Sequence, residues 1–497
     1  MKFRRKRSNK WKSKAKARIK EINALLKRIK ELIKSRDNWH NKYTDLQKKY
    51  KELEEENKKL KRELGKPEIN HQAPNKAQKP KYHSFSIVVI QVLLTITLKG
   101  NIKFRTLSKV EKIRYDVIKG NNEAPSHVTI RNWVLKVGYY ELTRTKEKSD
   151  DRIVILDHSI GLGQEKIFVV YSIYEKDFLK LNRPLQYSDL EVLLVKSVKK
   201  SDGELVASDI LELIEKYGIN YAVGDYGSDI KKGLRLLDIP HIHDLSHLFS
   251  IHIEKLYDKD ERYQNLKKEM SLMRKKFSQT TIAAIIPPKK RKKSEYQSFD
   301  KLIIWSERAL DLLNNRLTDK KIIKELIKEF DNATLERIRQ ELDWINNYTE
   351  LIKELSEINT VLKEIEKDMK HNGLTTITLI NAEVSLEKLT TANGILFKNN
   401  LLPKLHEQFN LLPDKDVILC SSDILESTFG KYKNRLSENS MASVTDLMLI
   451  IAAYTCNLTE EKIIECMENV KISDIKKWSE ENVGTSLSKQ RSLLLSG

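Results

Sequence analysis

Between residues 150 and 254, short apolar runs alternate with helical patterns in a fixed order. Three strands are followed by a helix, a strand, a second helix and a last strand, an order that indicates one α/β sheet. The runs that predict strands are residues 152–159, 166–173, 190–198, 220–227 and 239–244. Helical spacing is found at residues 202–217 and 228–237. This order constrains the fold more than any other feature of the chain.

Two acidic residues follow strands of this segment. Asp157 comes directly after the apolar run Ile153–Leu156, and Asp225 comes directly after Tyr221–Gly224. Aspartate is disfavoured inside strands, and carboxylates gathered at one edge of a sheet repel one another unless a cation lies between them. Oxygen ligands suit Mg²⁺ or Mn²⁺, and two such ions about 3.5–4 Å apart promote phosphodiester cleavage. The pattern therefore predicts a carboxylate metal site.

The order of strands and acids resembles the RNase H-like core of DDE transposases from bacterial insertion sequences. The resemblance implies that Asp157 and Asp225 are catalytic metal ligands and that a glutamate on a later helix is the third. Within the helical pattern at 422–436, Glu426 fits this role. Asp423 and Glu438 lie nearby and remain alternatives. The resemblance also implies two Mg²⁺ or Mn²⁺ ions as cofactors.

The 201 residues between Asp225 and Glu426 imply a large helical insertion, as in hAT-like transposases. The expected fold class is an α/β RNase H-like catalytic core interrupted by an all-α insertion. Core parts are expected at 150–254 and 416–497, with the insertion at 255–415. These groups carry a C/D-x-x-H motif that Asp244 and His247 match, in a supporting role that is catalytic or structural. A zinc site is an alternative use of the histidines His241, His243, His247 and His252.

Residues 1–66 combine a basic arm with heptad spacing. Residues at alternating steps of three and four from Ile22 to Leu64 are apolar except Arg36 and Asn57. This spacing is typical of a dimeric coiled coil, and a single solvated helix is the alternative. The segment holds 25 basic and 9 acidic residues, so it carries +16 of the chain's formal charge of +21. This excess predicts a polyanionic partner.

A proline-containing linker at 67–82 precedes three predicted helices, at 84–99, 106–119 and 127–138. Within the domain expected at 83–145, they suit a helix-turn-helix, with an ordinary three-helix bundle as the alternative. In the last helix, apolar residues share one face, which leaves Arg131, Asn132 and Lys136 outward as candidate DNA-binding residues. Further along, Lys431, Lys433 and Arg435 follow Glu426 and are either phosphate contacts or solvated surface.

The composition limits the remaining classes. Three cysteines without a CxxC pair indicate a reducing cytosol, and the longest apolar run, near Ile87–Leu98, is too short to span a bilayer. The sequence thus predicts a cytoplasmic, nucleoid-associated DDE transposase. It would bind the terminal inverted repeats of a mobile element, cut and join double-stranded DNA, and act as a homodimer or higher oligomer. The alternatives are a related nuclease or resolvase without strand transfer and a non-catalytic DNA-binding regulator.

Overall fold

The computed structural model divides into two compact units, residues 1–77 and 78–497. Its described residues are four single positions in the first unit and the ranges 78–118, 124–159, 165–289, 295–314, 332–436, 443–483 and 487–495. The four positions, Thr44, Lys48, Lys51 and Glu55, are helical and exposed. The apolar heptad positions expected to form the coiled coil lie outside the described residues, so that prediction is untested.

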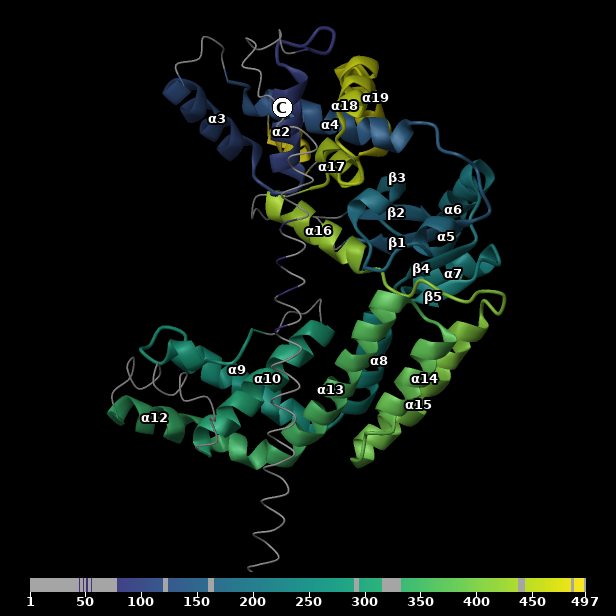
Figure 1. The fold of residues 1–497 in the computed structure, drawn as a ribbon. Coiled ribbons are helices and arrows are strands. Elements are labelled where there is room, and N and C mark those ends of the chain that lie inside the picture. The colour runs from purple at the N-terminus through teal and green to yellow at the C-terminus, as the bar shows by residue number, and fades with distance from the viewer. Residues whose placement is uncertain are drawn as a thin grey trace, which may run out of the picture. The chain divides into compact units, whose positions relative to one another are not determined.

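Five strands form one sheet within the described residues (Figure 1). They are β1 (Arg152–His158), β2 (Lys166–Tyr174), β3 (Glu191–Val198), β4 (Tyr221–Gly224) and β5 (His241–His243). The spatial order is β3-β2-β1-β4-β5. The pairs β1–β2 and β2–β3 are antiparallel, whereas β1–β4 and β4–β5 are parallel. All five strands occur where the apolar runs predict them.

The central strands are buried on both faces, which explains why their sequences read as continuous apolar runs. In β1, Val154 and Leu156 belong to the core shared with helices α6 (Gly203–Tyr217) and α7 (Ser228–Leu236). Their neighbours Ile153 and Ile155 belong to the larger core on the other face. The sheet is therefore the middle layer between helices, as expected for an α/β core.

Helix α16 (Asp423–Arg435) contacts β1 and belongs to the second face. The same side holds helix α4 (His127–Thr143), which contacts β3 and is surrounded by other helices (Figure 1). These are α2 (Ile87–Leu98), α3 (Phe104–Ile118), α17 (Leu449–Ala453), α18 (Glu460–Asn469) and α19 (Ile472–Asn482). Helices from both ends of the sequence thus pack together around α4.

The segment between β5 and α16 is helical, as expected for an insertion. Its helices are α8 (Leu245–Tyr257), α9 (Glu261–Phe277), α10 (Glu295–Leu313), α12 (Asn332–Leu342), α13 (Thr349–Asn372), α14 (Thr376–Leu386) and α15 (Ala392–Asn410). The remaining short elements are α5 (Glu175–Phe178), η1 (Tyr187–Asp189), η2 (Ala283–Ile285), η3 (Asp343–Tyr348), η4 (Asp446–Met448) and α20 (Leu487–Leu495). The fold is therefore an α/β sheet core with a helical block in its chain. Among the described residues, no helix is long and apolar enough to cross a membrane.

Candidate functional site

The two strand-end aspartates lie at adjacent positions of the sheet. In the parallel β1–β4 pair, Leu156 is the partner of Gly224, so Asp157 and Asp225 are the next residues on neighbouring strands. Gly224 makes this close approach possible: a Cβ atom there would lie 2.6 Å from the carbonyl oxygen of Leu156. Parallel pairing thus brings together two acids that are 68 positions apart in the sequence.

The electrostatics of Asp157 show that other acids are near it. Burial raises the pKa of Asp157 well above its usual value, and the negative charge of Asp225 raises the pKa further. Glu426 and Asp244 add smaller contributions in the same direction. One hydrogen bond opposes these effects, because a carboxylate oxygen of Asp157 accepts the main-chain N–H of His158 at 2.6 Å. The charges of Asp225, Glu426 and Asp244 therefore all act on Asp157, and that of Asp225 acts most strongly.

Glu426 lies in the first turn of α16, and its side chain is 40% exposed. Partial burial raises the pKa of Glu426, and the charges of Asp244 and Asp423 raise it further. His247 lies close, with its Nε2 atom 3.7 Å from a carboxylate oxygen of Glu426. Asp157, Asp244 and Glu426 thus come from distant parts of the chain and still act on one another electrostatically.

Asp244 differs from the other acids because its oxygens already have donors. It is 2% exposed and caps α8 by accepting the main-chain N–H of His247 at 2.9 Å. Its second oxygen accepts both the main-chain N–H and the hydroxyl of Ser422, at 2.7 and 2.9 Å. Its own N–H donates to the carbonyl of Gly224 at 2.8 Å. Asp244 thus joins β4, α8 and the start of α16, which favours a structural supporting role.

A second link, which no sequence pattern predicts, joins the helical block to α16. Lys370 of α13 forms ion pairs with Asp423 at 2.5 Å and with Glu366 at 2.6 Å. Burial lowers the pKa of Lys370, but these two carboxylates outweigh it, so the pKa is raised above its usual value. Glu366 also accepts the hydroxyl of Ser246 at 3.2 Å. Because lysines are frequent throughout this helical block, no sequence pattern distinguishes Lys370 from its neighbours.

The donor set of the acid cluster fits a hard divalent cation. Carboxylate oxygens are the preferred ligands of Mg²⁺, and the mutual repulsion that raises the pKa of Asp157 is what a cation would relieve. In the arrangement described, however, no group of three or more His, Cys, Asp or Glu side chains among the described residues is placed to hold a metal ion. The same finding covers the histidines for which zinc was an alternative.

The histidines of β5 are buried instead. Burial lowers the pKa of His241 to about 4 and that of His243 to about 2. Both ring nitrogens of each residue lack a hydrogen-bond partner among the described residues. The ring of His241 stacks on that of Tyr226 at a centroid separation of 5.2 Å, whereas the ring of His243 meets Tyr226 edge-on. These contacts indicate neutral rings in an apolar environment.

The candidate DNA-binding residues of α4 are not on the open surface that the helical pattern predicts. Arg131 forms an ion pair with Asp446 of η4 at 2.5 Å. Lys136 donates to the main-chain carbonyl of Met467 at 2.7 Å, and Asn132 is half-buried. The expected exposure is wrong because helices from the C-terminal part of the chain cover this side of α4. Whether these residues take part in DNA binding is a separate question that remains untested.

The basic residues at the end of α16 also have intramolecular partners. The ammonium group of Lys431 lies 4.1 Å from the ring centroid of Tyr187. Arg435 donates to the main-chain carbonyls of Thr97 and Ile102, which ties α16 to α2 and the residues after it. Lys433 is half-buried and also has an interaction partner. A role for these three residues in holding phosphate therefore stays a prediction.

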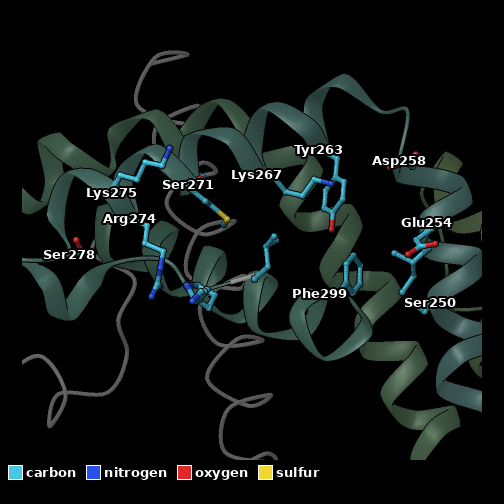
Figure 2. Close-up of a pocket in the computed structure, with 15 residues that line it drawn as sticks. Ser250, Glu254, Asp258, Tyr263, Lys267, Ser271, Arg274, Lys275, Ser278 and Phe299 are labelled. Atoms are coloured by element: carbon cyan, nitrogen blue, oxygen red, sulfur yellow. The ribbon is translucent and has the colours of Figure 1, made fainter. Parts of the chain in front are cut away.

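A cavity of about 530 Å³ lies between α8, α9 and α10 in the helical block (Figure 2). Tyr263 and Phe299 form part of its apolar wall, and Lys267 and Arg274 lie along it. Its lining contains none of the four clustered acids. The carboxylate cluster, rather than this cavity, is therefore the candidate site for chemistry. Comparison with protein-family models and with curated proteins gives no match for this chain.

Proposed function

We propose that the chain is a DDE-type transposase with an RNase H-like core. The carrying observation is the convergence of Asp157, Asp225 and Glu426 from two adjacent parallel strands and a distant helix. The first two acids stand where the resemblance expects them, at the ends of the first and fourth strands. The third comes from a helix beyond a long helical block, again as the resemblance expects.

In this proposal Asp157, Asp225 and Glu426 hold two Mg²⁺ or Mn²⁺ ions. Such ions supply an activated water and charge stabilisation for phosphodiester cleavage. The chain's own part is to hold three carboxylates close together against their repulsion. Asp244 fixes the start of α16, and with it Glu426, through its hydrogen bonds with Ser422. The parallel register of β1 and β4 positions the two aspartates.

Glu426 is a better third acid than its neighbours. Asp423 is paired with Lys370 at 2.5 Å, so its charge is already balanced, whereas Glu426 adds its charge to that of Asp157. Glu438, the other alternative, lies outside the described residues. The proposal therefore assigns Glu426 to the metal ions and Asp423 to the ion-pair link with the helical block.

The proposed partner is double-stranded DNA, first the terminal inverted repeats and then a target duplex, bound by a homodimer or higher oligomer. The formal charge of +21 supports a polyanionic partner. A cytoplasmic, nucleoid-associated protein is what this activity requires. The support for the oligomer comes from the heptad pattern of the sequence alone.

The test is a cleavage and joining assay with the full-length protein. The substrate is a supercoiled plasmid that carries the DNA flanking the coding region, with Mg²⁺ or Mn²⁺ added. We expect cleavage at the element ends and joined products. Asp157→Asn, Asp225→Asn and Glu426→Gln each keep the side-chain shape but remove a charge, so cleavage should fall by a factor on the order of 10³ or more.

Asp423→Asn and Glu438→Gln are the matched controls and should have much smaller effects on cleavage. A nick without a joined product would favour the related nuclease that lacks strand transfer. Full cleavage by Asp157→Asn or Asp225→Asn would overturn the proposal. Absence of cleavage together with sequence-specific DNA binding would instead favour the non-catalytic regulator.

A further inference from the structure

Helix α4 has little free surface left for a DNA duplex. It contacts α2 and α3 on the N-terminal side, α17, α18 and α19 on the C-terminal side, and β3 of the sheet. Two basic residues that the helical pattern predicts to face outward are bound by the C-terminal segment. Arg131 pairs with Asp446, and Lys136 donates to the carbonyl of Met467. A helix enclosed in this way cannot enter a groove without these contacts being broken.

Helix α3, by contrast, packs on α2 and α4, and most of its other side chains are exposed within the part of the chain that the structure describes. Leu107 and Glu111 are its buried residues, at 2% and 5% exposure. Figure 1 shows α3 at the margin of the helices that surround α4. The open surface carries two parallel stripes of side chains, one basic and one apolar.

The basic stripe consists of Arg105, Lys109 and Lys112, all of them exposed, and it ends at the exposed Asp116 on the same side of the helix. Steps of four and three residues place them on one side of a helix, about one turn apart. The ion pair of this helix, between Arg114 and Glu111 at 2.7 Å, does not involve them. A row of cations with this spacing can contact consecutive phosphates of one DNA strand.

The apolar stripe lies beside it and consists of Val110, Ile113 and Val117. Their exposed fractions are 52%, 62% and 77%, which is high for three aligned aliphatic residues. Aligned exposed apolar side chains mark an interaction surface more often than a bare solvent face. In the major groove such side chains pack against the methyl groups of thymine.

We propose that α3, not α4, is the helix of this domain that lies in the DNA major groove. The inference rests on the proposed function for the identity of the partner. The basic stripe selects DNA over a protein occupant, because three aligned cations beside an apolar row complement a phosphate backbone at the edge of a groove. Arg105, Lys109 and Lys112 contact phosphates, and Val110, Ile113 and Val117 contact base edges.

The first test measures the salt dependence of DNA binding. Full-length protein is titrated into a fluorescein-labelled random-sequence 30-base-pair duplex at several KCl concentrations, with anisotropy as the readout. The triple variant Arg105→Gln, Lys109→Gln, Lys112→Gln should lower the slope of log K against log [KCl] by about 2–3. Its affinity near physiological salt should fall roughly tenfold or more.

The matched control removes the same charge from a distant exposed surface, as Lys216→Gln, Lys259→Gln, Lys268→Gln. Its salt slope and affinity should stay close to those of the unmodified protein. If the two triple variants behave alike, the inference is overturned. This assay needs no cleavage, so its result is independent of the cleavage test. The role proposed for α3 can be wrong while the transposase activity is confirmed, and the role of α3 can be right while no cleavage is found.

The second test locates the helix directly. A photoreactive benzoylphenylalanine replaces Ile113 of α3 or, as the control, Leu272 of α9, which is 49% exposed. Irradiation with the labelled duplex should join DNA to position 113 and leave position 272 unlabelled. A crosslink from position 113 to a second copy of the chain, or to its own first 77 residues, would overturn the inference by assigning the apolar stripe to a protein contact.

Discussion

The carboxyl ends of β1 and β4 and the surface of α4 are two regions for which the sequence predicts functional side chains. At the strand ends, Asp157 and Asp225 occupy adjacent positions, as their sequence context predicts. On α4, Arg131 and Lys136 are engaged with the C-terminal segment, although the helical pattern leaves them outward. A strand's position in a sheet is fixed by its neighbours' main chains, whereas a helix face is free only until another element covers it.

The same difference applies to α16. The charge of Glu426 reaches Asp157 because α16 packs on β1, and Arg435 has partners because the other end of α16 meets α2 and the residues after it. The cations of α16 thus have partners within the chain, while the role of its acid stays a prediction. Four experiments test whether packing, rather than the sequence pattern, determines the exposure and the role of these residues.

The largest effect is expected from filling the contact between α4 and α17. A Cβ atom on Gly138 would lie 2.0 Å from the carbonyl oxygen of Leu449, which is main chain and cannot move aside. Gly138→Ala should therefore lower the free energy of unfolding by about 3 kcal/mol or more, measured by denaturant titration. A smaller loss would mean that α17 does not enclose α4.

Gly430→Ala in α16 is the matched control for this measurement. A Cβ atom there meets nothing within 4 Å, so no overpacking arises. Because alanine is a better helix former than glycine, the variant should gain up to about 1 kcal/mol of stability. The two alanine variants should thus change stability in opposite directions.

The second effect concerns the link between the helical block and α16. Lys370→Met keeps the length of the side chain but leaves Asp423 and Glu366 without their cation. If Lys370 positions Glu426 through α16, cleavage should fall about 10–100-fold while DNA affinity changes little. Lys370→Arg should restore much of the cleavage. Equal losses for the Met and Arg variants, or an unchanged rate for both, would count against a positioning role.

The third effect comes from His252 in α8, the helix that starts at the acid cluster. Burial lowers the pKa of His252 to about 4, below the usual value near 6.5, so the folded state binds fewer protons than the unfolded state. Its contribution to stability is present above pH 6.5 and is lost as the pH falls towards 4. At pH 5 the loss should be about 1–2 kcal/mol.

Replacing His252 with phenylalanine, next to Phe397, should remove this part of the pH dependence. The comparison is between unfolding free energies of the two proteins at pH 7 and pH 5. An equal change in the unfolding free energy of both proteins between pH 7 and pH 5 would show that the His252 ring is not shielded from solvent in the folded protein.

The smallest effect separates structure from recognition on α4. Arg131→Met breaks the ion pair with Asp446, whose side chains are 34% and 24% exposed, and should lower stability by about 1 kcal/mol. Combining Asp446→Asn with Arg131→Met should lower stability little further, because both substitutions remove the same ion pair. A loss of sequence preference without a loss of stability would return α4 to the role of recognition helix.

The five strands, the helical character of the block after them and the two aspartates at the strand ends could be predicted from the sequence alone. Apolar runs such as Ile153–Leu156 need burial on both faces, and an acid directly after such a run marks the strand's end. The match between Asp157 and Asp225 then follows from parallel pairing. These features are local, so spacing and composition are enough to find them.

The exposure of the helix surfaces depends instead on tertiary packing. Arg131, Lys136 and Arg435 find partners more than 300 positions away, and no local pattern records such contacts. The link from Asp244 to Ser422 spans 178 positions, and that from Lys370 to Asp423 also joins two separate helices. A helix's period says which residues share a face, but the packing of remote helices determines whether that face meets solvent, protein or DNA.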